Sequence, residues 1–242
     1  MPQFTALDNV AHADLKVATQ FGAAFENNVN QTLVFPTEFQ LLQREYPIFF
    51  RKNEDGAFYA VALLGLDKDE NLYLDNDQWQ ANYIPAVQKR GPFALAINSD
   101  TPDADPVVQV DVDDARVSEA EGEALFLPFG GNTPYFDDML MTLRRIHVGS
   151  QVTNDFFKYL EQFQLIEPVT VQASFSEHMQ YTVPDIYSIS KERMKSLTGD
   201  ELFQLNQLGL LEHCFAVMAS ADNMSCLTDK KAIRLAETGV AL

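Results

Sequence analysis

Apolar runs separated by turn residues dominate the stretch from 46 to 97. Segment 57–64 is apolar at nearly every position, whereas a half-exposed strand alternates apolar and polar residues. A short unbroken run between turns favours a strand covered on both faces, with a buried helix as the alternative. Together with the apolar runs at 47–50, 72–74 and 93–97, it predicts an antiparallel meander that forms the central sheet.

The pattern changes to a helical spacing in the second half of the chain. Thr133 and Pro134 are residue types that begin helices. Apolar residues then recur every three or four positions as far as Phe163, which predicts a long amphipathic helix. Gly149 lies within this helix, and we expect a kink or a restart there or shortly after it.

Beyond the long helix, the chain predicts a hairpin and shorter helices. Segments 169–175 and 180–183 are rich in strand formers and flank a short polar connection. Ser190 is placed to cap one helix, and Thr198 has the capping-box spacing for another. From about Asp229 the pattern weakens, and we expect a frayed end.

These elements predict an α+β fold. The antiparallel central sheet comes from the N-terminal half and packs with the long helix and with a C-terminal hairpin plus helices. A short helix over 38–45, capped by Thr37, precedes the sheet. We expect a single domain over 1–242, with sub-domains at 1–128, mainly β, and 133–242, mainly α.

Charge narrows the classes of partner. The 242 residues include 35 Asp and Glu but only 17 Lys and Arg, which gives a net charge of −18. This balance disfavours nucleic acids and anionic membranes as partners. No apolar stretch is long enough to span a bilayer, and the first residues lack the basic and apolar regions of a signal peptide. We therefore expect a cytoplasmic protein.

Carboxylates are densest between 100 and 123, and such a segment could hold Ca²⁺. Its spacing is not that of an EF-hand loop, so we favour a solvated acidic edge with a one-turn helix near 118–122. The four histidines stand apart in sequence, and there is no Cys-x-x-Cys motif. The sequence thus supports no specific metal site and no cofactor.

No catalytic residue can be assigned from the sequence. His213 and Cys214 are adjacent on a predicted helix, so their side chains diverge by about 100° and cannot pair as base and nucleophile. On one helix, Cys214 and Cys226 would lie roughly 18 Å apart, too far for a disulfide. The alternative to a binding protein is an enzyme, either a transferase or a metal-assisted oxidative or hydrolytic one. Its site would be assembled from distant carboxylates and a histidine.

Aromatic residues, prolines and cations gather in the connection 75–92. Trp79 is the only tryptophan, Tyr83 and Arg90 follow it, and Tyr46 precedes the sheet. One interpretation is a recognition groove with aromatic walls and a cationic end. The other, favoured on general grounds, is a connection whose aromatic rings fill the core. Tyr46, Trp79, Tyr83 and Arg90 are our candidate ligand-binding residues, and the candidate ligand is a small molecule, peptide or glycan.

The order of several short motifs resembles that of the SapC family of bacterial proteins. The motifs are FPTEF at 35–39, EYPIFF at 45–50, VALLGL at 61–66, ENLY at 70–73, YIPA at 83–86, RGPF at 90–93, LRRIH at 143–147 and LIEP at 165–168. The resemblance covers nearly the whole chain. It implies no reaction and no catalytic residues.

The resemblance does imply a role for the protein. Genes of the family often lie near those for flavin-dependent tryptophan halogenases, cupin- or JmjC-like oxygenases and TonB-dependent receptors. This implies a helper in the uptake or modification of peptides or glycans, with a halogenase- or oxygenase-type enzyme as a partner. We therefore expect a non-enzymatic binding or accessory protein.

Overall fold

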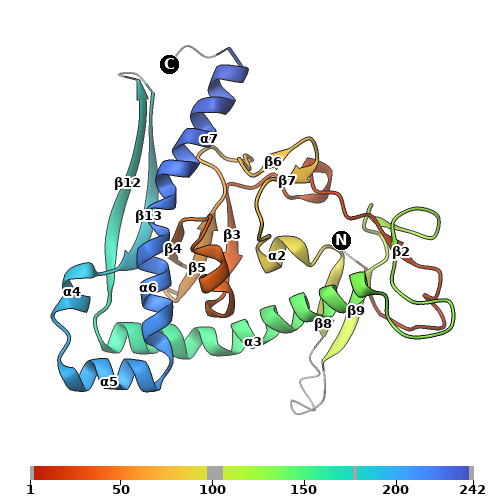
Figure 1. Ribbon diagram of the computed structural model, residues 1–242, viewed down its shortest axis with the longest axis horizontal. Helices are drawn as coiled ribbons and strands as arrows, with labels where there is room; N and C mark the ends of the chain where they lie inside the picture. Colours follow the sequence, from red (N-terminus) through yellow and green to blue (C-terminus); the bar gives the residue numbers. More distant parts are fainter. Residues whose placement is uncertain (1–2, 97–105, 177–178, 240–242) are drawn as a thin grey trace.

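A five-stranded antiparallel sheet lies at the centre of the protein (Figure 1). The computed structural model describes residues 3–96, 106–176 and 179–239. The strand order is β12-β13-β4-β5-β3, and the strands are β3 (Gln31–Val34), β4 (Ile48–Lys52), β5 (Phe58–Leu63), β12 (Ile166–Ser176) and β13 (Met179–Ile189). With the helices described below, this sheet confirms the predicted α+β class.

The apolar run at 57–64 forms β5, as predicted. Its residues from Ala60 to Leu63 each expose 2% or less of their surface. β5 pairs with β4 on one side and with β3 on the other. An unbroken run of apolar residues is the pattern expected of such a strand, because both of its faces exclude water. The alternative of a buried helix is therefore wrong.

The predicted meander is wrong in its outer strands. The segment at 72–74 contributes to β6 (Leu74–Asp75), which pairs only with β7 (Gln78–Trp79). β8 (Phe93–Ala96) belongs to a separate sheet of three strands. Their order in that sheet is β1 (Phe4–Ala6), β9 (Val107–Asp111) and β8.

The C-terminal hairpin occupies the place that the meander was expected to fill. Tyr187 of β13 lies opposite Phe50 of β4, so the segments 1–128 and 133–242 contribute strands to one sheet. The far end of the hairpin extends beyond the sheet and runs beside α7 (Asn223–Glu237) (Figure 1). Pairing between strands so distant in sequence depends on tertiary contacts, which local patterns do not encode.

A third sheet contradicts the one-turn helix predicted near 118–122. Here β10 (Val117–Ser118) and β11 (Glu123–Ala124) flank β2 (Lys16–Val17). Gly122, between them, has a φ of +114°, and a Cβ added to it would lie 2.6 Å from the Val17 carbonyl carbon. The turn therefore lies directly against β2, where only glycine fits. Residues 100–105 of the acidic segment lie outside the described residues.

The long helix α3 (Pro134–Gln162) begins as predicted, because the Thr133 hydroxyl accepts a hydrogen bond from the Phe136 amide at 3.2 Å. The restart expected at or shortly after Gly149 is wrong, since the helix is continuous through that residue. Gly149 instead allows a close approach to the chain before α1 (Phe39–Leu42). A Cβ at this position would overlap the Phe35 side chain and lie 2.7 Å from Thr37 Oγ1.

Gly149→Ala is therefore expected to destabilise the protein, although alanine favours helices. The clash with Phe35 and Thr37 outweighs the gain in helix propensity, and we expect a loss of about 2 kcal/mol in the free energy of unfolding. Urea denaturation measures it. The matched control is Gly199→Ala, because no atom lies within 4 Å of a Cβ added at that helical glycine. Equal stability of the two variants would contradict the close approach.

The helix predicted over 38–45 is shorter than expected. Pro36–Glu38 forms a 3-10 turn (η2), which leads into α1. The Thr37 hydroxyl does not cap this helix; it donates to the Arg145 carbonyl of α3 at 3.1 Å. This hydrogen bond attaches the segment to α3. A second 3-10 turn, η1 (Ala23–Phe25), lies in the N-terminal region.

The C-terminal helices begin where their caps predict, but the fraying predicted from about Asp229 is wrong as far as Glu237, where α7 ends. Ser190 caps α4 (Lys191–Lys195), and Thr198 forms the capping box of α5 (Gly199–Gln207). After α6 (Leu210–Ser220), α7 continues to Glu237. Leu227, Lys231 and Leu235 form the buried stripe of α7 at intervals of four residues. A lysine in the middle of this stripe concealed it in the sequence.

Buried apolar residues of the described chain form two clusters. The larger surrounds the central sheet and includes the second half of α3. The smaller includes Phe93, Val110 and Phe136, and it lies where the first half of α3 passes β8 and β9. Figure 1 shows α3 running along the bottom of the view from the sheet to β8 and β9, with the short helix α2 (Ala86–Lys89) above it. None of the described helices is both long and apolar enough to cross a membrane.

Candidate functional site

Three of the four candidate ligand-binding residues form one hydrogen-bonded chain. The Trp79 indole Nε1 donates to the Tyr46 hydroxyl at 2.7 Å, and that hydroxyl donates to the Tyr83 carbonyl at 2.6 Å. Tyr46 is completely buried, its ring lies 4.5 Å from that of Tyr73, and burial raises the pKa of its hydroxyl. In this arrangement a ligand cannot reach Tyr46. The residue supports the connection 75–92 from within.

A buried carboxylate holds the same connection in place. Glu38 has no exposed surface. It accepts hydrogen bonds from the Tyr83 hydroxyl at 2.8 Å and from the Ala86 amide at 3.0 Å, as well as from the Phe35 amide at 3.1 Å. Arg145 of α3 donates to the same Tyr83 hydroxyl at 3.0 Å. Burial raises the pKa of Glu38, while the hydrogen bonds and the Arg145 charge act in the opposite direction.

Tyr46 and Glu38 contact the inner side of the connection 75–92, and residues on its outer side line a cavity. The cavity has a volume of about 220 Å³ and lies where the connection, the chain after β2 and α3 meet. Its walls are formed by Val17, Ala18, Thr19, Gln20, Phe21, Ile84, Gln88, Lys89, Gly91, Pro92, Arg116, Tyr135, Asp138 and Met139. Val17 and Met139 also belong to the smaller apolar cluster, so the cavity adjoins that core.

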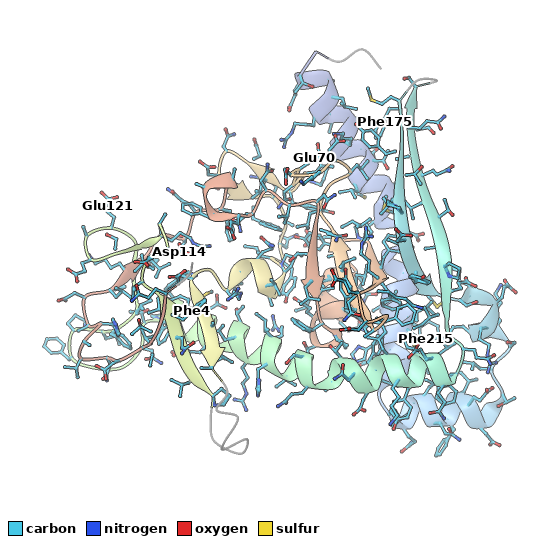
Figure 2. All side chains as sticks on the ribbon, turned by 180° about the vertical axis from the view of Figure 1, so that it is seen from behind. Phe4, Glu70, Asp114, Glu121, Phe175 and Phe215 are labelled. Atoms are coloured by element: carbon cyan, nitrogen blue, oxygen red, sulfur yellow. The ribbon has the colours of Figure 1, made fainter. Side chains whose placement is uncertain are left out.

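Most of the cavity surface is apolar, but charged side chains also line it. Two cations line it, and each is matched by an acid. The Lys89 ammonium lies 2.6 Å from an Asp138 oxygen, and the Arg116 guanidinium lies 2.5 Å from Asp114. Figure 2 labels Asp114 at the end of the molecule that carries the small strands. The volume is below the roughly 300 Å³ at which pockets for whole small molecules begin, and it suits a single bulky side chain.

Trp79 does not line this cavity, but it contacts a residue that does. Its ring contacts Phe21 edge to face, with the centroids 5.5 Å apart, and Phe21 lines the cavity. Arg90 is separate from the other three candidates. Its guanidinium donates to the Phe93 carbonyl at 2.7 Å and lines a different hollow beside α3. The structure therefore brings Tyr46, Trp79 and Tyr83 together but not Arg90.

Sequence reasoning missed most of the residues that line the cavity. Phe21, Arg116 and Asp138 come from three segments that are distant in sequence, and none belongs to a recognisable motif. Glu38 was also missed, because carboxylates are rarely fully buried and the sequence carries no mark of such burial. The RGPF and YIPA motifs were the one available signal, since Ile84, Gly91 and Pro92 within them line the cavity.

The reactive side chains are arranged as separate groups. Among residues 3–96, 106–176 and 179–239, no three His, Cys, Asp or Glu side chains gather as metal ligands. Cys214 and Cys226 are both free thiols, as predicted. Burial raises the pKa of Cys214 to about 12 and lowers that of the neighbouring His213. The Cys214 thiol therefore stays protonated at neutral pH.

Fold and cavity together define an α+β protein with a mainly apolar cavity whose two lining cations are each paired with an acid. The SapC family model matches residues 7–227, which is nearly the whole chain and includes every residue that lines the cavity. The chain therefore belongs to the SapC family. No curated protein and no solved structure matches it.

Proposed function

We propose that this protein is a non-enzymatic binding or accessory protein of the cytoplasm that holds a peptide by one bulky apolar side chain. The observation that carries the proposal is the cavity beside the connection 84–92, with its apolar walls and a volume of about 220 Å³. Burial of a large aromatic or aliphatic side chain contributes about 1.5–3 kcal/mol. A cavity of this kind therefore supplies an anchor for a longer chain.

A peptide fits the cavity better than a glycan. Saccharides present hydroxyl groups, which require a matching set of hydrogen-bond partners when they are buried. The strongest hydrogen-bonding groups at this cavity, Lys89 and Arg116, are already paired with Asp138 and Asp114. An apolar side chain needs no such partners. The proposed partner is thus a peptide or a protein segment, including one that belongs to a modifying enzyme of the halogenase or oxygenase type.

The segment that lines the cavity is held rigidly, which favours binding. Tyr46 and Glu38 fix it from the inner side through hydrogen bonds to Tyr83 and Ala86. A wall that is already in place need not be ordered when the ligand arrives, so less binding energy is lost.

Ile84→Asp tests this proposal. Ile84 lines the cavity and is partly exposed, so the variant should fold while an apolar ligand would have to desolvate the new carboxylate. We expect binding of pentapeptides with a central Phe or Leu among glycines to weaken about tenfold or more. Titrations followed by Trp79 emission and by calorimetry measure it, because Trp79 contacts the cavity through Phe21.

The control is Ile233→Asp on α7, where the isoleucine is 60% exposed; it should bind like the unmodified protein. A pentapeptide with central Ser should bind more weakly than the Phe peptide. Maltotriose binding in place of the peptides would support the glycan version instead. Equal affinities of the Ile84→Asp and Ile233→Asp variants for the Phe peptide would rule out the cavity as the site.

A further inference from the structure

The loop between β11 and α3, residues 125–133, presents an aromatic side chain to solvent. Phe129 is fully exposed, and its exposed fraction is the largest among the exposed apolar side chains of the described chain. Leu127, two residues earlier, exposes 46% of its surface. The sequence between Glu123 and Asp137 contains no charged residue, although the chain as a whole has a net charge of −18. This segment, the Phe129 loop, is therefore a neutral apolar projection from an acidic protein.

Backbone hydrogen bonds hold the Phe129 loop in one shape. The Leu127 amide donates to the Gly131 carbonyl at 2.9 Å, and the Gly130 amide donates to the Leu127 carbonyl at 3.0 Å. At the base of the loop, the Thr133 amide donates to the Leu125 carbonyl at 2.9 Å. Gly130 and Gly131 have φ angles of +93° and +92°, a region that favours glycine. Because the loop is ordered by its own backbone, it loses little freedom when its exposed ring binds.

The Phe129 loop and the cavity described above lie at the same end of the molecule. The loop begins after β11, which pairs with β2, and Val17 of β2 lines the cavity. It ends at α3, whose first turns contribute Tyr135 and Met139 to the cavity walls. Figure 1 shows β2 and the start of α3 on the right, away from the central sheet. Two copies that meet at this end can each present a loop to the cavity of the other.

The cavity suits the side chain that the loop presents. Its volume of about 220 Å³ and its mainly apolar walls fit one bulky apolar side chain. The Lys89 and Asp138 side chains beside it are partly exposed, so the cavity is accessible from the surface. A neutral loop reaches it without adding to the repulsion between two acidic chains. A two-fold symmetric dimer uses the same surface on both copies, so the contact between loop and cavity is made twice.

We propose that the protein forms a two-fold symmetric dimer in which Phe129 of each copy occupies the cavity of the other. The inference rests on the proposed function, because it uses the same cavity for an apolar side chain, and it names a second copy of this chain as an occupant. Two short loops form a small interface, and small interfaces are weak and transient. The dimer should therefore dissociate on dilution, which leaves the cavity free for other peptides.

Sedimentation equilibrium of the full chain at about 1–300 µM tests the proposal, and we expect a monomer–dimer equilibrium in this range. Phe129→Asp and Ile84→Asp should each raise the dissociation constant of the dimer about tenfold or more, because a carboxylate on either side of the contact would have to lose its water. The control is Phe203→Asp, at another exposed phenylalanine, on α5. This variant should dimerise like the unmodified protein.

Mixing the two variants identifies the contact itself. In the mixed dimer, the intact loop of the Ile84→Asp chain meets the intact cavity of the Phe129→Asp chain, so one of the two contacts is restored. An equimolar mixture should therefore contain more dimer than either variant alone at the same total concentration.

A monomer at every concentration, a dimer unaffected by Phe129→Asp, or no gain on mixing would overturn the proposal. Titration with the Phe pentapeptide separates this inference from the proposed function. If the protein is monomeric but binds the peptide and loses that binding in Ile84→Asp, only the dimer is rejected. If the peptide does not bind either, the proposed function fails as well.

Discussion

Glu38→Ala is expected to lower the free energy of unfolding by about 4 kcal/mol, the largest effect we predict. The substitution removes the acceptor for the Phe35 and Ala86 amides and for the Tyr83 hydroxyl. Glu38 is fully buried, so water does not readily replace the lost carboxylate. Each buried donor left without a partner costs about 1–3 kcal/mol, and Arg145 would also lose a nearby negative charge.

Two further variants make this result interpretable. Glu38→Gln keeps the volume and one acceptor oxygen, and we expect it to lose roughly half as much stability. Glu237→Ala, at an exposed glutamate near the end of α7, should change stability by less than about 0.5 kcal/mol. Urea denaturation followed by Trp79 emission measures all three. If Glu38→Ala were as stable as Glu237→Ala, the network around Tyr83 would not hold the cavity wall.

Lys231→Met is expected to cost about 3 kcal/mol, the second-largest effect. Lys231 is only 3% exposed, and its ammonium lies 2.5 Å from Asp67 and 2.6 Å from Glu70. The same ammonium lies 5.2 Å from the centre of the Tyr181 ring. It thus joins α7 to the turn after β5 and to the hairpin. Figure 2 shows Glu70 beside α7. Methionine keeps the length of the side chain, so the loss reports mainly the missing charge.

The effect of Lys231 should persist across neutral pH. Burial acts to lower its pKa, but the hydrogen bonds and charges of Asp67 and Glu70 outweigh burial and raise it. A raised lysine pKa contributes stability that is fully present below the pKa of the unfolded chain. This stability is lost as the pH rises through the folded-state pKa, in the alkaline range.

Controls separate the buried ion pair from ordinary surface pairs. Lys195→Met breaks the pair with Glu192, but both side chains are largely exposed, and the loss should be less than about 1 kcal/mol. Adding Glu70→Gln to Lys231→Met should recover part of the lost stability, because it removes the carboxylate that had lost its partner. A double variant less stable than Lys231→Met would contradict this account.

The outcome for the candidate site shows why side-chain roles are hard to read from sequence. Clustering of Tyr46, Trp79 and Tyr83 was expected from their positions around the connection, and the structure places them together. Sequence does not state which way a side chain faces. Tyr46 is buried, and the cavity is lined by neighbouring residues such as Ile84 and Lys89. The alternative in which aromatic rings fill the core describes Tyr46.

The sequence by itself determined the elements whose signals are local. The apolar run of β5 and the caps at Thr133, Ser190 and Thr198 all act within a few residues, so their chemistry is written in adjacent positions. The α+β class followed from the same local periods of two and of about four residues.

Only the tertiary structure decided how these elements meet. It paired β13 with β4, buried Glu38 and Lys231, and placed Gly149 against Phe35. Each of these features depends on residues more than a hundred positions apart or on partners that satisfy a buried charge. Such partners are chosen by packing and by the need to match buried hydrogen-bonding groups, and neither leaves a periodic mark in the chain.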